Sequence, residues 1–519
     1  MKRNTFLAFV LLSSLIFAQD GNLDTNFGTN GYVAFNTTDI GIYNDCLQPD
    51  GKIIYRQDNT IQRLNQNGSS DTSFGNSGSI SIIDPGVHRY GILHTDTDNQ
   101  IVTFTKNLYT TYYMTKYNLD GTHDANFGTN GQGYIHLDVD DIKSPLIVRS
   151  SPNGSIFVGG NDDRSGTGVD NLFLRKYDTD GIADTSFHYT ASNIGINLGS
   201  TPVGHSSDDR AVDVDIMSDT KIVVTGRGTY YNVNSVSHYK SSIVIIENGV
   251  TNPIKKSAPY SNPSHVVKTN TTIDQNDTIY MLTGINNTFT VNPVNIIHKW
   301  NSSGTLIDFG AEDRLTITLE VNPNEFANFQ RILVQPDGKF ILAGTTFNTN
   351  LTGFKKPNLI IARFLADGTL DTTFGSNGYV LHAITYSGTS TDNTSHSITN
   401  LFATDDYNSI YMSGRNAENT VILKYSIPSL LSVEDVQVTN TPIHIFPNPA
   451  KDIISINAVD PTRLHQKQYA IIDITGQTIK QGTFYNDREA SNMNISQLSN
   501  GIYFLKIESF NEVLKLIKK

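Results

Sequence analysis

Short apolar runs, each preceded by polar turn residues, recur along most of this 519-residue chain. A representative run is VQPDGKFILAGT at residues 334–345, where an Asp-Gly turn precedes an apolar strand. Asp-Gly and Asn-Gly pairs tolerate positive φ angles and favour tight hairpins. No stretch beyond the apolar N-terminal leader sustains a helical period. The pattern predicts an all-β protein built from many short strands.

This turn-and-strand phrase occurs seven times between residues 20 and 425. Its turn anchors are Asp50, Asp98, Asn153, Asp219, Asp277, Asp337 and Tyr407. Successive anchors lie 48 to 70 residues apart, so the chain contains a long internal repeat. Four short strands with their turns need roughly forty residues. Each unit therefore has room for a four-stranded sheet and long loops.

A second phrase ends most units in a DTxFG-like tail, as in IARFLADGTLDTTFG at 361–375, although the fourth unit, at about 200–250, lacks a recognisable one. The seventh unit stops after VILKYS at 421–426, before its tail. The missing tail stands at the other end of the repeats as DGNLDTNFGTNGYV, residues 20–33. A closed ring needs its last unit completed from its beginning, whereas a linear array does not. We therefore predict a seven-bladed β-propeller over residues 19–427, closed by the N-terminal strand.

The residues of the tail have structural explanations. Its Asp is expected to cap its own turn, and its Phe is expected to wedge between neighbouring blades. The Asp residues are Asp24, Asp71, Asp124, Asp184 and Asp371, and the Phe residues are Phe27, Phe74, Phe127, Phe187 and Phe374.

Six units place a cation and then a bulky apolar residue at the end of the second-phrase strand. The cations are Arg63, Lys116, Lys176, Lys299, Arg363 and Lys424. They could form a basic ring that binds an anionic glycan, or each could contact the repeated Asp nearby. The second interpretation is favoured, because structural repeats usually repeat structural contacts.

The two phrases together resemble the delta-60 repeat family of secreted bacterial proteins. The resemblance covers residues 20–425, and its most specific stretch is DGTLDTTFGSNGYV at 367–380. It implies a propeller-like shape and brings no agreed ligand or reaction with it.

The pattern changes after residues 428–441, which are predicted to be a linker. Residues 442–519 contain several short strands and suggest a small Ig-like β-sandwich. They resemble the type A sorting domain of the type IX secretion system of Bacteroidota. The matching motifs are FPNPAKD (446–452), IIDITGQTI (471–479), LSNGIYFLKI (498–507) and LKLIKK (514–519). The resemblance implies that the secretion machinery is a partner and that cargo crosses the outer membrane, to be anchored at the surface or released. An accessory ligand-binding sandwich is the alternative.

Residues 1–18 are predicted to be a secretory signal peptide. Lys2 and Arg3 precede an apolar run that is too short to span a bilayer. No later segment is long and apolar enough for a membrane helix. Both ends of the chain therefore predict a secreted or cell-surface protein without an integral membrane segment.

The formal net charge of −12 argues against a nucleic-acid partner, because phosphate backbones attract basic surfaces. The single cysteine, Cys46, cannot form an internal disulfide. No HExxH, GxSxG or phosphate-loop motif is present. The sequence thus assigns no catalytic, cofactor-binding or metal-binding residue and implies no cofactor.

Three polar stretches have weaker interpretations. GHSSDDR at 204–210 is predicted to be a solvated loop rather than a reactive site. DVDD at 138–141 lacks the glycine and distal glutamate of an EF-hand. Asp213-Val214-Asp215 reads as a strand with its acids on the wet face. Weak calcium binding at these acidic stretches stays open.

The sequence supports three functions. The first is a secreted binding or scaffold protein that holds a glycan or a protein at one rim of the propeller. The second is a carbohydrate-active hydrolase or lyase that uses carboxylates of the central channel. The third is a passive component of the cell envelope.

Overall fold

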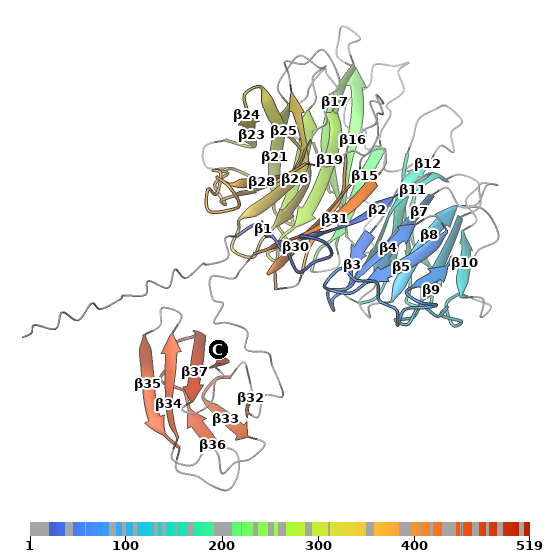
Figure 1. Cartoon of the computed structure of the whole chain (residues 1–519). Coiled ribbons are helices and arrows are strands. Elements are labelled where there is room, and N and C mark those ends of the chain that lie inside the picture. Colours follow the sequence, from blue (N-terminus) through green and yellow to red (C-terminus); the bar gives the residue numbers. More distant parts are fainter. Residues whose placement is uncertain are drawn as a thin grey trace, which may run out of the picture. The chain divides into compact units, whose positions relative to one another are not determined.

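The computed structural model divides the chain into two compact units, Met1–Ser429 and Leu430–Lys519 (Figure 1). The leader at 1–18 and the linker at 428–441 lie outside the described residues. The residues that the structure describes are 20–36, 45–57, 59–82, 90–95, 100–106, 112–128, 133–137, 142–151, 153–162, 171–190, 210–218, 221–231, 237–247, 254–257, 266–285, 293–309, 312–348, 358–383, 397–404, 406–415, 419–427, 443–446, 448, 450–458, 467–473, 477–484, 491–507 and 513–519.

The described residues of the first unit form seven antiparallel sheets, numbered here in chain order. Sheet one contains β3 (Asp45–Leu47), β4 (Ile53–Gln57), β5 (Thr60–Leu64) and β6 (Ser79–Ser81). Sheet two contains β7 (Tyr90–Thr95), β8 (Ile101–Lys106), β9 (Tyr112–Tyr117) and β10 (Tyr134–Leu137). Sheet three contains β11 (Ile142–Ser150), β12 (Ile156–Asp162), β13 (Asn171–Tyr177) and β14 (Ala183–Thr190). Sheets four and five contain β15 (Arg210–Ile216), β16 (Ile222–Tyr231), β17 (Ser237–Ile246) and β18 (Ile254–Ser257); and β19 (Val266–Ile273), β20 (Ile279–Ile285), β21 (Val294–Trp300), β22 (Leu306–Ile307) and β23 (Leu315–Ile317). Sheet six contains β24 (Glu320–Asn322), β25 (Glu325–Val334), β26 (Phe340–Asn348), β27 (Leu359–Phe364) and β28 (Tyr379–His382).

The seventh sheet joins the two ends of the repeats. It contains β29 (Ser397–Ala403), β30 (Ser409–Arg415) and β31 (Asn419–Ser426), together with β1 (Asn22–Leu23) and β2 (Tyr32–Asn36). Leu23 lies opposite Tyr425, and Ala34 lies opposite Val421 (Figure 1). The N-terminal segment therefore completes the sheet that the end of the repeat region leaves short, as the sequence predicts.

One strand of each sheet faces the neighbouring sheets. These seven strands, called the inner strands below, are β3, β7, β11, β15, β19, β25 and β29. Each contacts the next in chain order, and β29 contacts β3. The succession of contacts thus returns to its starting point.

The repeated tails seal the boundaries between sheets. Their five Phe residues are all buried, and Phe27 packs in one cluster with Ile53 of β4 and Tyr411 of β30. The Asp of each of the five tails accepts a hydrogen bond from the backbone N–H two residues later. The glycine after Phe74 donates its N–H to the Asp120 carbonyl of the next unit, at 2.8 Å. Both expected roles of the tail are therefore confirmed.

Four of the six cations at the strand ends contact the repeated Asp. The pairs are Arg63–Asp71 (2.7 Å), Lys176–Asp184 (3.2 Å), Arg363–Asp371 (2.8 Å) and Lys424–Asp24 (3.0 Å). The last pair joins the seventh unit to the N-terminal tail. These contacts support the structural interpretation of the cations, because a paired and buried cation is not free to bind a glycan.

The described residues of the second unit form two sheets around one hydrophobic core. One sheet contains β32 (Ile443–Phe446), β33 (Ile453–Ala458) and β36 (Ser491–Asn494), and the other contains β34 (Gln468–Asp473), β35 (Thr478–Thr483), β37 (Gly501–Ile507) and β38 (Val513–Lys518). Ile454, Ile471 and Leu505 come from both sheets and belong to this core. The Asn448 side chain donates to the Lys515 carbonyl and accepts from the Ile517 N–H, so the FPNPA motif holds the last strand.

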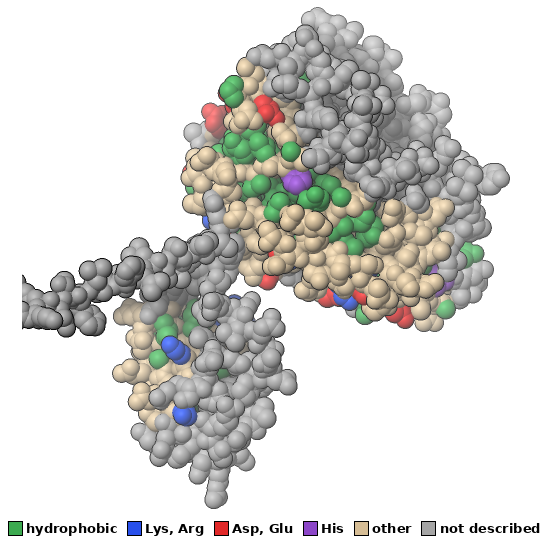
Figure 2. Space-filling model, viewed as in Figure 1, with side chains coloured by type: hydrophobic (Ala, Val, Ile, Leu, Met, Phe, Trp, Pro, Cys, Tyr) green, Lys and Arg blue, Asp and Glu red, His purple; other side chains and the backbone are tan. Residues whose placement is uncertain are grey.

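No helix in the described part of the chain is long and apolar enough to cross a membrane. In the view of Figure 2, hydrophobic and uncharged side chains dominate the described surface of the first unit, and its acidic side chains lie near the edges.

A disulfide test follows from the pairing of β2 with β31. Opposed residues of an antiparallel pair lie within the range that a disulfide can bridge. We expect Ala34→Cys combined with Val421→Cys to form a cross-link on mild oxidation. The measurement is a faster-migrating band on a non-reducing gel, with thiol titration. Ala34→Cys alone should give no such band, and free thiols in the folded double variant would contradict the pairing.

A stability test follows from Arg363, whose side chain is buried, with 2% of the residue exposed. Its guanidinium pairs with Asp371 at 2.8 Å and with Asp20 at 2.7 Å. Removing one partner of a buried ion pair leaves an uncompensated charge, so Arg363→Gln should cost about 3–5 kcal/mol of unfolding free energy in urea. The exposed Lys256 supplies the control, and Lys256→Gln should stay within about 0.5 kcal/mol of the wild type. Equal, small effects of the two changes would show that the buried pair is unimportant.

Candidate functional site

Polar side chains gather on the inner strands at matching positions. The side chains at one register level are Asp213, Asn270, Arg331 and Asn400, which lie opposite Thr225, Leu282, Ala343 and Ser413 of the following strands. Three of these four strands carry a register shift just before the polar residue. Such bulges re-aim side chains. The inner-strand cluster comprises these four residues with Asp45, His94, Arg149 and Asp215.

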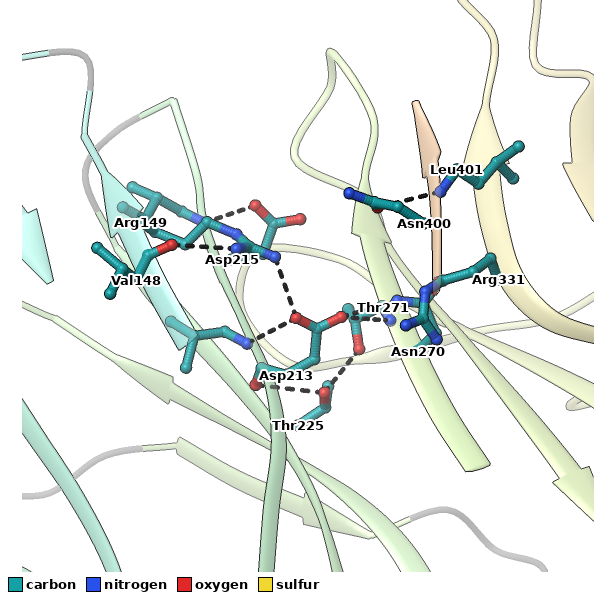
Figure 3. A network of polar contacts seen from close by, with 12 residues as sticks. Val148, Arg149, Asp213, Asp215, Thr225, Asn270, Thr271, Arg331, Asn400 and Leu401 are labelled. Atoms are coloured by element: carbon teal, nitrogen blue, oxygen red, sulfur yellow. Dashed lines mark hydrogen bonds and ion pairs between the residues drawn. The ribbon is translucent and has the colours of Figure 1, made fainter. Parts of the chain in front are cut away.

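Asp213 of β15 lies at the centre of the contacts that Figure 3 shows. Its Oδ1 pairs with Nη2 of Arg149 from β11 at 3.3 Å. Its Oδ2 accepts hydrogen bonds from the Asn270 amide at 2.8 Å and from the Thr271 N–H at 3.3 Å, both on β19. One carboxylate thus ties together three neighbouring inner strands.

The contacts continue from β19 to β29. Oδ1 of Asn270 accepts the Ile332 N–H of β25 at 2.9 Å. Nη2 of Arg331 donates to the Thr399 carbonyl of β29 at 2.7 Å. Gln330, also on β25, accepts the Ile398 N–H at 3.0 Å.

The remaining contacts lead from β29 back to β11. The Asn400 amide donates to the Asp45 carbonyl of β3 at 2.8 Å, although 355 residues separate the two. Thr95 of β7 donates to the Leu47 carbonyl at 3.4 Å. Nε2 of His94 accepts the Ser150 N–H of β11 at 2.8 Å. A side chain therefore bridges every pair of neighbouring inner strands.

Burial dominates the electrostatics of the cluster. It raises the pKa of Asp45 and the pKa of Asp215 to about 6 each. It lowers the pKa of His94 to about 3, with a further decrease from the charge of Arg149. The neutral imidazole agrees with an Nε2 atom that accepts a hydrogen bond. The cluster thus holds two carboxyl groups whose protonation changes near pH 6, beside two guanidinium groups.

The structure corrects one sequence expectation. Asp213 was expected on a wet face but is only 8% exposed, because inner strands lie on both sides of β15. The alternation itself is right, since Val214 is buried on the opposite face. Residues 138–141, and all of 204–210 except Arg210, lie outside the described residues. Among the side chains that the structure describes, no group of three or more His, Cys, Asp or Glu could hold a metal ion.

Sequence reasoning assigned no residue of the cluster to a site, although a signal was present. In five units a polar residue stands five to seven positions before the turn anchor, on the inner strand. These residues are Asp45, Asp213, Asn270, Arg331 and Asn400. The signal is hard to use because the residue type changes from unit to unit.

Two family models match the chain. Residues 444–519 match the secretion system C-terminal sorting domain. The C-terminal segment is a sorting domain. It directs export through the type IX secretion system to the cell surface or the extracellular space. Residues 48–74 and 335–374 match a domain of unknown function described as a β-propeller. The sorting domain is thus joined to an all-β unit with a propeller fold.

Three solved structures are similar to the chain. The polysaccharide lyase Uly1 is 9% identical, with 79% of this chain and 98% of that one covered and a TM-score of 0.43. PorZ, a surface component of the type IX secretion system of Porphyromonas gingivalis, is 10% identical, with coverages of 95% and 82% and a TM-score of 0.24. The α-L-arabinanase of Penicillium chrysogenum is 9% identical, with coverages of 66% and 94% and a TM-score of 0.37. Among curated proteins, none has a sequence that matches this chain.

The pKa of Asp45 predicts how stability changes with pH. The folded-state pKa of about 6 lies above the ordinary value of 3.8, so the stability due to the protonated carboxyl is complete below pH 3.8 and is lost as the pH rises through 6. Between pH 3.5 and pH 8, the wild type should lose about 3 kcal/mol of unfolding free energy relative to Asp45→Asn. Urea titrations across this range measure the difference. Asp50→Asn, at an exposed position nearby, should give a curve parallel to the wild type, and a parallel curve for Asp45→Asn would disprove the assignment.

Proposed function

We propose that the chain is a secreted or surface-delivered seven-bladed propeller that binds a glycan or a protein, followed by a sorting domain with a sandwich fold. The propeller comprises residues 19–427, the linker 428–441 and the sorting domain 442–519. The signal peptide 1–18 is removed on export. The seven sheets are the blades, and the inner strands line a central channel.

The observation that carries this proposal is the contrast between repeated and unrepeated contacts. The paired cations, the buried Phe residues and the capping Asp residues recur from unit to unit, as structural contacts do in repeat proteins. The inner-strand cluster recurs less strictly, because the matching positions of four units carry three residue types: Asp213, Asn270, Arg331 and Asn400. Residues that differ within an otherwise regular frame are where a specific function is expected.

Binding fits the cluster better than hydrolysis. A glycosidase needs two carboxyl groups that are free to face one sugar bond. Asp213 instead accepts hydrogen bonds from Asn270, Thr271 and its neighbour Val214 and pairs with Arg149. A carboxylate held by four contacts positions its neighbours and is poorly suited to attack a substrate.

A hydrolase or lyase is the second candidate, favoured by one observation. The pKa of Asp215 is raised to about 6, and a carboxyl group that keeps its proton in this range can act as a general acid. In this alternative, Asp215 would donate a proton to the leaving oxygen of a sugar. A passive envelope protein is the third candidate.

A glycan array and a polysaccharide-degradation screen on the purified full-length chain separate these functions. We expect binding without turnover. Turnover that Asp215→Asn abolishes, with an unchanged thermal unfolding midpoint, would establish the enzyme instead. If the chain binds no glycan, degrades no polysaccharide and captures no protein at the cell surface, the result would favour a passive envelope protein.

A further inference from the structure

We infer that the inner-strand cluster binds an anionic sugar, bearing a carboxylate or a sulfate group, through the guanidinium groups of Arg149 and Arg331. This inference rests on the proposed binding function and names its ligand class. It follows from the way the two arginines are held, from their mutual repulsion, and from the contrast with Arg63 and Arg363, which are buried and paired with carboxylates.

Arg149 is fixed in place but accessible. Its Nη1 donates to the Val148 carbonyl at 3.1 Å, and its Nη2 pairs with Asp213. The side chain is nevertheless 39% exposed. Arginine has five N–H donors, so three have no partner among the described residues. A preorganised guanidinium of this kind suits the bidentate recognition of carboxylate and sulfate groups.

Arg331 approaches the same centre from the other side of Asp213 (Figure 3). Its Nη1 donates to the Gln330 carbonyl and its Nη2 to the Thr399 carbonyl, at 3.0 and 2.7 Å. Both acceptors are neutral backbone groups, so they orient the guanidinium without neutralising it. Its positive charge is therefore balanced only through space, by the carboxyl groups of Asp213 and Asp45.

The two guanidinium groups repel each other. Burial lowers the pKa of Arg331, the carboxyl groups of Asp213 and Asp45 oppose this decrease, and the charge of Arg149 adds to it. An additional anion bound at the exposed side of Arg149 would relieve this repulsion. Asp45 and Asp215 are largely protonated below pH 6, which leaves two guanidinium groups with the one carboxylate of the Arg149–Asp213 pair.

The cations of the strand ends are unsuited to this task. Arg63 and Arg363 each contact a buried tail Asp, and both are at most 5% exposed. Arg149 differs, because it combines one long carboxylate contact with substantial exposure. The accessible arginine of the cluster is therefore the better anchor for an anionic ligand.

Calorimetric titration of the full-length chain tests the inference with three probes: an oligomer of galacturonic acid, a sulfated galactan oligomer and a neutral galactan oligomer. We expect the acidic or the sulfated oligomer to bind and the neutral one to bind at least about tenfold more weakly. Arg149→Gln should weaken the binding by at least about tenfold. Asp215→Asn should strengthen it at pH 7.5, because it removes a negative charge close to Arg149. Lys256→Gln, at an exposed cation on β18, should leave it unchanged.

Thermal unfolding checks that each variant is folded. If Arg149→Gln is not folded, Arg149→Lys replaces it, because lysine keeps the positive charge but lacks the two-pronged guanidinium group. Equal affinity for acidic and neutral oligomers, or binding that neither Arg149 change weakens, would overturn the inference. Binding of the neutral oligomer alone would overturn it and leave the proposed glycan binding intact. Failure of all three probes and of the glycan array would reject both.

Discussion

The pairing of β1 and β2 with β31 is the constraint on which the N-terminal unit depends. Two backbone hydrogen bonds join the ends of the repeats: the Gly21 N–H donates to the Ser426 carbonyl, and the Asp24 N–H donates to the Lys424 carbonyl, each at 2.9 Å. The N-terminal segment also carries Phe27, whose ring packs between the seventh sheet and the first. Each sheet therefore has a neighbour on both sides, and no apolar face is left at an end of the array. Closure supplies the stability that a disulfide supplies in many secreted proteins, which this chain cannot form internally.

Repetition and divergence are divided between different parts of each sheet. The sequences of the tails and strand ends repeat because they do the same task at each boundary between sheets. There the Phe ring of a tail is buried, its Asp caps a turn, and a cation of the strand end pairs with that Asp. The seven inner strands contact one another in succession, and each lies between a different pair of neighbours. There a bridge such as Asn400 to the Asp45 carbonyl needs only a side chain that reaches the next strand. That requirement permits different residues in different units, and so permits an asymmetric cluster inside a regular frame.

The sequence was informative where a residue acts through local geometry. DTxFG tails, Asp-Gly turns and the displaced tail at residues 20–33 have fixed spacings, so they predicted the caps, the wedges and the pairing of the chain ends. The inner-strand cluster depends instead on which residues of distant strands face one another. A bulge before Asp213 or Arg331 shifts the facing residue by one position and does not appear in the pattern of apolar residues. The expectation of a wet face for Asp213 failed because alternation gives the two faces of a strand but not what covers them, and inner strands lie on both sides of β15.

The charges of the cluster are difficult to explain by stability alone. Only 17% of the residues are charged, yet two arginines and three aspartates of the cluster lie on the inner strands of the first unit. Desolvating such groups costs several kcal/mol per ion, and replacing buried ion pairs by well-packed apolar residues is often neutral or stabilising. A fold that already closes through its backbone gains little from these ions, and their presence is better explained by a charged partner that they meet.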